Sequence, residues 1–310
     1  MPARACKLFE LSIRITVAIP THNRASTLRE TLASVAAQRV SAEVELDCLV
    51  VDNNSTDDTA AAVDSFRATS PLTVRRVFET GAGSSFARNR AVRETDADFV
   101  FFLDDDAIAE PNWADEMLAE LQRRTLDAAC GMVVPKWTVA PPRWLGPKLW
   151  VKLAVHDRNL IECEPLERAE VHSNYFSANV GFRRETFERF GMFREDLGVV
   201  GGNPISGEDT ELFQRIIARR GAIGFARGAI VHHQIGAERM TRNYLLRKSF
   251  AYGIGSAITA GASHNGLDKL VRNAMRMTAA AIRGDAETAI YHELECANFL
   301  GYWRGKLMRR

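Results

Sequence analysis

The chain has 310 residues, with 40 Lys and Arg against 39 Asp and Glu, a formal net charge of +1 at pH 7 and 46% hydrophobic residues. A hydrophobic fraction this high excludes a chain that is disordered throughout. The near-zero net charge argues against a protein that coats nucleic acid by neutralising its phosphates. We therefore expect a globular protein of one large domain, or one domain with an appendage, and no nucleic-acid partner.

The cysteines and the N-terminal segment indicate the compartment. The five cysteines are scattered and form no CxxC pair, so neither a disulfide framework nor a structural zinc site is expected. The N-terminal segment lacks an apolar run followed by a small-residue cleavage site, so we expect no signal peptide. The longest uncharged stretch, residues 249–267, is too rich in Gly, Ser and Thr for a membrane span. These features predict a cytoplasmic protein.

Strands and helices alternate through the first third of the chain. Short β-branched or apolar runs predict strands at 15–19, 44–51, 73–77 and 98–103. Helical spacing of apolar residues predicts helices at 26–38, 56–66 and 84–93. This alternation is typical of right-handed βαβ units around a mostly parallel sheet, which places the chain in the α/β class.

The remainder is less regular. It contains predicted helices at 113–124 and 208–219 and predicted strands at 128–134, 174–182, 222–225 and 229–231. Residues 135–171 form a long segment rich in Pro and Trp without clear periodicity, and from residue 238 onward the pattern is helical.

Polar clusters follow the predicted strands at the point where each one ends. In open α/β sheets the ligand site lies beyond the carboxyl ends of the strands, and these ends carry Thr21–Arg24, Asp52–Asn54 and Asp104–Asp106. Three adjacent carboxylates repel one another and are most simply stabilised by a divalent cation such as Mg²⁺ or Mn²⁺. A solvated acidic turn is the alternative interpretation.

Six segments in order carry a resemblance to a known family. They are Val17–Arg24, Val50–Asp57, Gly81–Arg90, Phe102–Asp106, Ala178–Arg184 and Gly207–Leu212. Together they resemble the motifs of family 2 glycosyltransferases with the GT-A fold, over residues 15–233. The acidic triplet resembles that family's DXD motif, and Gly207–Leu212 resembles its Glu-Asp motif. One such segment would be weak evidence, whereas six in the family's order are strong evidence.

The resemblance implies a nucleotide-sugar donor site and a divalent metal, Mn²⁺ or Mg²⁺. The residues it assigns to the donor are Pro20, Thr21, Asn23, Arg24, Asp52, Asn54, Arg88, Asp104 and Asp105. The metal would be held by Asp106 and Asp104, with His232 as a weaker candidate. Only one residue of the His232–His233 pair can face the site, since side chains alternate across a strand; a hydrogen-bonded structural role is the alternative for either.

Asp209 matches the carboxylate that removes the proton from the acceptor hydroxyl in this family. A base is needed because a sugar hydroxyl is a poor nucleophile at neutral pH. A diphosphate on a metal leaves readily, and one direct displacement would invert the anomeric configuration. Glu208 and Asp209 could alternatively do no more than favour a helix N-terminus through its dipole.

We therefore expect a GT-A catalytic domain at residues 1–235 and a helical C-terminal extension at 236–310. The nucleotide-sugar half would span about 13–107 and the acceptor half about 108–235. Asp52 and the resemblance favour a UDP- or dTDP-sugar donor, and the acceptor would be a carbohydrate, a glycolipid or a natural product. A catalytically inactive nucleotide-sugar-binding subunit and a sugar-phosphate nucleotidyltransferase remain alternatives.

The C-terminal extension carries many cations, and the oligomeric state cannot be predicted. Its cations include Arg242, Arg247, Lys248, Arg272, Arg276, Arg304 and Lys306. They could contact anionic lipid and hold the enzyme peripherally at the inner face of the membrane. A solvated helix surface is the alternative, and the favoured one.

Overall fold

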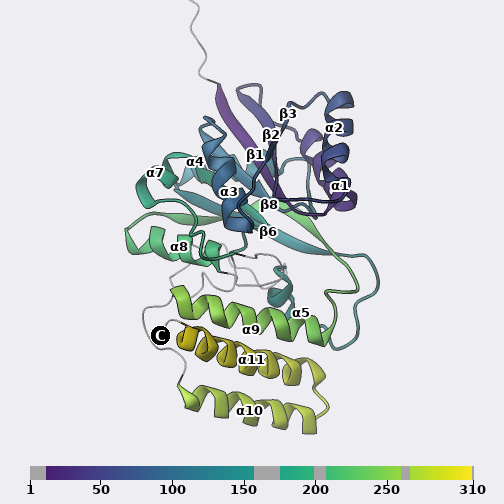
Figure 1. Cartoon of the computed structure of the whole chain (residues 1–310), viewed down its shortest axis with the longest axis vertical. Coiled ribbons are helices and arrows are strands. Elements are labelled where there is room, and N and C mark those ends of the chain that lie inside the picture. Colours follow the sequence, from purple (N-terminus) through teal and green to yellow (C-terminus); the bar gives the residue numbers. More distant parts are fainter. Residues whose placement is uncertain (1–11, 157–174, 199–206, 260–265, 309–310) are drawn as a thin grey trace, which may run out of the picture.

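The computed structural model describes residues 12–156, 175–198, 207–259 and 266–308. In this part of the chain an eight-stranded mixed sheet is flanked by helices, and three long helices stack beneath one end of it (Figure 1). The predicted α/β, GT-A-like class with a helical C-terminal region is confirmed.

The strands of the sheet run in the order β3-β2-β1-β4-β7-β6-β8-β5. Their bounds are β1 Ile13–Thr21, β2 Val44–Asp52, β3 Val74–Phe78, β4 Phe99–Leu103, β5 Ala107–Ala109, β6 Ala128–Trp137, β7 Asn179–Arg183 and β8 Ile223–Ile235. Strands β1 to β4 are parallel, β7 is antiparallel to both β4 and β6, and β6 and β8 are parallel to each other. The sheet is therefore mostly parallel in direction, with β7 and β5 reversed.

The helices cover both faces of the sheet and continue beyond it. Their bounds are α1 Ala25–Ala36, α2 Thr59–Thr69, α3 Ser84–Arg93, α4 Trp113–Arg123, α5 Pro147–Trp150, α7 Glu185–Phe190, α8 Glu208–Ala218, α9 Arg242–Thr259, α10 Leu267–Ile282 and α11 Ala286–Met308. A single 3-10 turn, Val151–Leu153, follows α5.

Strand β4 lies at the centre of the core, as its nearly all-apolar sequence predicts for a strand covered on both faces. On one face Phe101 packs edge-to-face on Trp113 of α4, with ring centroids 5.8 Å apart. On the other face Phe102 packs edge-to-face on Phe182 of β7 and on Phe193. The strand is thus rigidly held, and so is the acidic triplet that follows it.

Asn179, fully buried in β7, ties three strands and a helix together. Its Nδ2 donates to the carbonyl oxygens of Met132 and Ala229, and its Oδ1 accepts from the indole N–H of Trp113. The bonds to β6 and β8 lie where the register between those strands shifts. The two short strands predicted at 222–225 and 229–231 are therefore one strand, β8, interrupted by a bulge.

Helix α2 begins later than the predicted residue 56 because a side chain from another loop captures its first N–H groups. Asn23 Oδ1 accepts from the N–H groups of Thr56 and Asp57. Asp57 in turn accepts from the N–H of Thr59, the first helical residue. The β1–α1 and β2–α2 loops are thereby fastened to each other.

Glycines bring α9 and α11 into backbone contact. A Cβ on Gly253 would overlap the carbonyl oxygen of Asn298, and a Cβ on Gly301 would overlap that of Phe250. The Gly-rich composition that excludes a membrane span here serves a close helix–helix contact. No helix among the described residues is long and apolar enough to cross a membrane.

Candidate functional site

A pocket of about 410 Å³ opens beyond the carboxyl ends of β1 and β4. Pro20 and Asp104–Asp106 form its sheet side, and Glu208 and Asp209 at the start of α8 line it as well. The C-terminal helices complete the wall with Lys248 and Tyr252 of α9 and Asn298 of α11. Both halves of the predicted catalytic domain and the C-terminal helices therefore contribute to one cavity.

Hydrogen bonds fix the acidic triplet at the end of β4. The N–H of Ala107 donates to the carbonyl oxygen of Asp104 and closes a turn over the triplet, and the N–H of Gln234 donates to the carbonyl oxygen of Asp106. The Asp106 carboxylate is buried, whereas the Asp104 side chain is 36% exposed. Their backbone positions are thus determined by the sheet, and all three line the pocket.

The three carboxyl groups titrate differently. Partial desolvation in the pocket wall raises the pKa of Asp104, against the charge of Arg88. Burial and the charge of Asp106 raise the pKa of Asp105 to about 7. Burial opposes ionisation of Asp106 too, but its contacts with His233 and Arg239 hold the Asp106 pKa well below its ordinary value. Of the three, Asp106 is therefore the carboxyl group most strongly held in its ionised form.

Arg239 and His233 surround the Asp106 carboxylate. Arg239 Nη2 donates to Asp106 Oδ2 at 2.8 Å, and Arg239 Nη1 lies 2.7 Å from His233 Nε2. His233 Nε2 lies 3.3 Å from Asp106 Oδ1. The predicted weak metal ligand, His232, points away from this group, and its Nε2 lies 2.9 Å from Glu110 Oε1. Of the two adjacent histidines the structure brings His233 to the acidic cluster, and the choice of His232 is corrected on that point.

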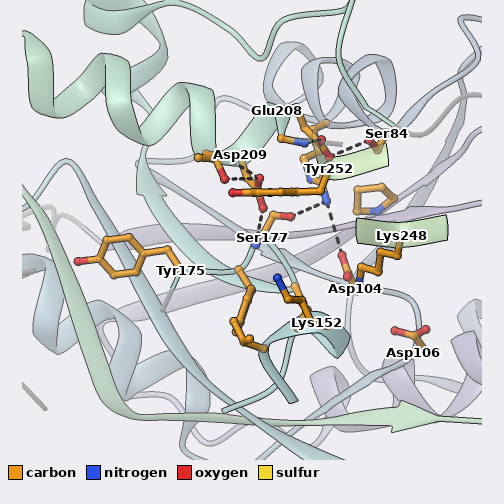
Figure 2. A pocket seen from close by; sticks show the side chains of 18 of the residues that line it. Ser84, Asp104, Asp106, Lys152, Tyr175, Ser177, Glu208, Asp209, Lys248 and Tyr252 are labelled. Carbon is orange, nitrogen blue, oxygen red and sulfur yellow. Dashed lines mark hydrogen bonds and ion pairs between the residues drawn. The ribbon is translucent and has the colours of Figure 1, made fainter. Parts of the chain in front are cut away.

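A buried network joins the acidic triplet to α8. Arg88 Nη1 donates to Glu208 Oε1 at 2.7 Å, and Arg88 Nη2 donates to Ser177 Oγ at 2.9 Å. The same guanidinium lies 3.7 Å from Asp104 Oδ1, and Ser84 Oγ also donates to Glu208 (Figure 2). Arg88 thus lies between the carboxylate at the end of β4 and the first turn of α8.

Asp209 faces the same pocket from the first turn of α8. Its Oδ2 accepts from the backbone N–H of Ser177 at 3.3 Å, and its Oδ1 accepts from the N–H of Thr210 at 2.7 Å. Burial and the adjacent charge of Glu208 raise the pKa of Asp209, against Arg88. A carboxylate with a raised pKa, held at a cavity wall, is suited to accept a proton near neutral pH.

Lys248 of α9 supplies a further positive charge, and in Figure 2 it lies beside Asp104. Burial and the neighbouring charge of Arg239 lower the pKa of Lys248 to about 8, while the carboxylates of Asp104, Asp106 and Asp209 oppose this. Burial also raises the pKa of Tyr252 to about 12, so its phenol remains protonated. Lys248 is therefore mostly cationic at pH 7 and aimed at the acidic triplet.

The predicted site residues divide into two groups. Those that line the pocket are Pro20, Arg88, Asp104, Asp105, Asp106 and Asp209. Those that lie outside its lining are Thr21, Asn23, Arg24, Asp52, Asn54 and His232. Arg24 lies close to the first group, since its Nη1 is 4.0 Å from Asp106 Oδ2.

Two of the residues outside the pocket lining, Asn23 and Asn54, stabilise the loops in which they lie. Asn23 and Asn54 both adopt positive φ, of 54° and 61°, a conformation that Asn tolerates better than most residues. Asn23 binds the loop before α2, and Asn54 Nδ2 donates to the carbonyl oxygens of Glu79 and Thr80. A role of either side chain toward a donor stays a prediction.

Asp52 occupies the end of β2, paired in register with Thr21 of β1. Its Oδ1 accepts from the N–H of Ser55 at 3.0 Å. Its Oδ2 lies 3.7 Å from Arg76 Nη1, which is longer than a hydrogen bond. The Asp52 side chain is 3% exposed, and its role toward a donor base stays a prediction.

The motifs did not predict several residues of the pocket wall. Tyr175, Phe176 and Ser177 precede β7, Lys152 belongs to the 3-10 turn, and Tyr252 and Asn298 lie on the C-terminal helices. Lys152 Nζ is held by Glu295 Oε1 of α11 at 2.8 Å. Arg239 and Lys248 carry a weak sequence signal, because they follow the histidine pair in a basic segment.

Comparison with known proteins identifies the family. Residues 16–191, more than half of the chain, match the model of the family described as "Glycosyl transferase family 2". The chain belongs to this family. It is a glycosyltransferase that uses a nucleotide sugar, and the predicted family and enzyme class are confirmed.

Relatives and solved structures agree with this assignment. The chain is 26% identical to the succinoglycan biosynthesis protein ExoM of Rhizobium meliloti (strain 1021) over 250 residues, covering 78% of this chain and 74% of that protein. It is 24% identical over 251 residues to the glucosyl-dolichyl phosphate glucuronosyltransferase of Haloferax volcanii (strain DS2), covering 79% and 77%.

The fold is similar to that of the mannosyltransferase PcManGT from Pyrobaculum calidifontis in complex with GDP-Man and Mn²⁺. The TM-score is 0.65 at 20% identity, over 96% of this chain and 88% of that one. TarS of S. aureus (residues 1–349) in complex with UDP gives a TM-score of 0.52 at 17% identity, over 96% and 91%. At these identities the likeness shows the GT-A fold.

Proposed function

We propose that the enzyme is a metal-dependent, inverting glycosyltransferase that transfers a sugar from a UDP- or dTDP-sugar to an acceptor hydroxyl. The observation that carries the proposal is the pocket itself, in which Asp104–Asp106 and Asp209 line a single cavity. The first group suits a nucleoside diphosphate with its cation, and Asp209 suits an acceptor hydroxyl.

The charges of the pocket support a requirement for a divalent cation. Five carboxyl groups line it (Asp104, Asp105, Asp106, Glu208 and Asp209), against four cationic side chains (Arg88, Lys152, Arg239 and Lys248). A donor diphosphate adds further negative charge to this near-neutral cavity. A divalent cation would offset that charge and would stabilise the charge that develops on the departing diphosphate.

The donor set fits Mg²⁺ or Mn²⁺ when the diphosphate supplies the other ligands. Among the described residues, no three His, Cys, Asp or Glu side chains are arranged to hold an ion by themselves. Mg²⁺ in nucleotide sites is usually held by one or two carboxylates and by substrate phosphates, so a protein cage is not required. Asp106, with Asp104, would hold the cation, and Arg239 would have to release Asp106 Oδ2 for this.

Asp209 is the proposed base. In its ionised form it would accept the proton of the acceptor hydroxyl as that oxygen attacks the anomeric carbon from the side opposite the diphosphate. Its raised pKa brings it closer to the pH at which proton transfer is efficient. Ser177 and Thr210 keep the carboxylate in place through their backbone N–H groups.

The donor diphosphate would be bound by cations from different parts of the fold. Arg88 comes from α3, Arg239 follows β8 and Lys248 comes from α9. Asp52 Oδ2 would accept the ring N–H of uracil or thymine, with Thr21 and Arg24 beside the nucleoside. Relatives of the fold include complexes with UDP, UDP-GlcNAc and GDP-Man, so the nucleotide must be tested directly.

The acceptor would enter beside Asp209, where Phe176 and Tyr252 supply aromatic surface. Aromatic faces pack well on sugar rings, so a carbohydrate or glycolipid acceptor fits this wall. We keep the proposed division into a donor half at about 13–107 and an acceptor half at about 108–235, with residues 236–310 adding part of the acceptor wall.

The test is calorimetric titration with UDP, dTDP and GDP, each with Mn²⁺, with Mg²⁺ and with EDTA. The same series is run on Asp106→Asn and on Glu110→Gln, a control on the partner of His232 outside the pocket. We expect metal-dependent binding of UDP or dTDP that Asp106→Asn weakens and Glu110→Gln preserves. Binding of GDP alone would refute the donor assignment. Equal binding in EDTA would refute the metal requirement, and binding without transfer to any acceptor would favour an inactive binding subunit.

A further inference from the structure

Helix α10 exposes a stripe of four large apolar side chains along one face. Leu267, Val271, Met275 and Ile282 are 70%, 55%, 66% and 81% exposed. At the α-helical angle of about 100° per residue they fall within an arc of about 80°. Single exposed apolar residues are common on protein surfaces, whereas a stripe that follows one helix face indicates a contact surface.

The stripe points away from the rest of the protein. The buried residues of α10 are Asn273 and Ala280, on the side that packs against α11, and Asn273 Oδ1 lies 3.0 Å from His292 Nδ1 of α11. This buried side is about 180° around the helix from the centre of the stripe. Figure 1 shows α10 as the outermost of the three C-terminal helices, farthest from the sheet. One face of α10 therefore packs against α11, and the opposite, apolar face is exposed.

Three exposed arginines lie to one side of the apolar stripe. Arg272, Arg276 and Arg283 occupy an arc of about 40° that begins about 60° beyond one edge of it. Asp268, also exposed, pairs with Arg272 at 2.9 Å. An amphipathic helix with large apolar residues on one face and cations beside them suits the boundary between lipid headgroups and acyl chains.

We propose that α10 docks the enzyme on an anionic lipid surface, with Leu267, Val271, Met275 and Ile282 inserted and the arginines on the headgroups. Charge complementarity favours this occupant over a second copy of the chain. In a symmetric dimer with antiparallel α10 helices packed through this face, the arginines of both copies would lie on the same side of the interface, where they repel. Anionic headgroups accept the arginines while the acyl region accepts the stripe. The proposal stands whatever nucleotide or acceptor the enzyme uses.

The test is flotation of the full chain with vesicles of phosphatidylcholine, with and without phosphatidylglycerol, at low and high salt. We expect binding to the anionic vesicles that weakens as salt rises. Val271→Glu with Met275→Glu should lower the vesicle partition coefficient at least tenfold. Arg276→Gln should lower it about fivefold, on anionic vesicles only. Val139→Glu, at an equally exposed apolar residue outside the C-terminal helices, should change nothing.

Three results would overturn the proposal. One is the absence of flotation with anionic vesicles, and another is flotation that the double variant leaves unchanged while circular dichroism shows it folded. The third is light scattering that gives a dimer which the double variant converts to a monomer, because α10 would then cover a second copy. Nucleotide titration of the double variant separates this test from the proposed activity, since its pocket is intact.

Discussion

The buried pair of Arg88 and Glu208 gives a prediction whose size follows from the structure. The two side chains are 6% and 8% exposed and 2.7 Å apart, and Arg88 also contacts Ser177 and lies 3.7 Å from Asp104. We consider Arg88→Met, Glu208→Gln and the double variant. Each single change removes one charge from a site that little solvent reaches.

The two single variants should differ in cost. Removing one partner of a buried ion pair costs about 3–5 kcal/mol, and Arg88→Met falls at the upper end because it leaves Asp104, Glu208 and Asp209 without their shared cation. In Glu208→Gln the new amide oxygen can still accept a hydrogen bond from Arg88, and Arg88 keeps Asp104 and Asp209 as neighbours. We therefore expect this variant to lose about 2 kcal/mol in free energy of unfolding. The double variant should cost about 2 kcal/mol less than the sum of the single changes, since the charge left by one change is removed by the other.

Urea unfolding followed by circular dichroism measures the free energy of unfolding of the three variants. Together with the wild-type value these complete a double-mutant cycle for Arg88 and Glu208. Arg184 and Glu188, an exposed pair on one helix at 2.9 Å, provide the matched control with an expected coupling of about 0.3–0.5 kcal/mol. Additive costs for Arg88 and Glu208, or a loss below about 1 kcal/mol for Arg88→Met, would refute the reasoning. The same variants should lower nucleotide affinity, because Arg88 lies between the triplet and α8.

Three further predictions concern the base, the cation of α9 and the helix contact. Asp209→Asn should reduce transfer at least about 100-fold. Nucleotide binding and the melting temperature should stay unchanged, because burial already disfavours the charged form of Asp209. The rate of the wild-type enzyme should fall as the pH drops through the raised pKa of Asp209. Nucleotide affinity should weaken above about pH 8 as Lys248 loses its proton, and Lys248→Arg should remove that loss in titrations at two pH values. Gly301→Ala should lower the free energy of unfolding by about 1–3 kcal/mol, because the new Cβ would overlap the Phe250 carbonyl group. This loss outweighs the gain in helix propensity of about 1 kcal/mol. Gly305→Ala is the control and should cost less, since the nearest atom to its new Cβ would be 2.8 Å away.

The first half of the fold could be predicted because local pattern and global position agree there. Strands β1, β2 and β4 are each paired on both sides with parallel or antiparallel neighbours. The sequence of β4 is a continuous apolar run, and β1 and β2 contain the apolar runs Val17–Ile19 and Cys48–Val51 near their carboxyl ends. Strand β5, with three residues, and helix α7, with six, were not predicted. Segments this short carry too little periodicity, and pairing with β8 and packing against the sheet hold them in place.

The acidic half of the site was predictable for the same reason. A carboxylate at the end of a parallel strand must face the ligand edge of the sheet, so Asp104–Asp106 could be placed without knowing anything else about the fold. The choice between His232 and His233 depends on register. Ala107 lies opposite His233 in the β5–β8 ladder, which turns His233 toward Asp106. That register depends on the three-residue strand that sequence patterns miss.

The acceptor side of the site, and the cations Arg239 and Lys248, could not be placed from the sequence, because their positions depend on how the C-terminal helices pack. Tyr252 and Asn298 lie on different helices, and they reach the pocket only because α9 and α11 touch at their glycines. Apolar periodicity is weak on these helices, since glycine rather than a large side chain makes the contact. The C-terminal extension is therefore a wall of the pocket. It follows that substitutions on the facing sides of α9 and α11 should alter the acceptor site while Asp104–Asp106, fixed by β4, stay in position.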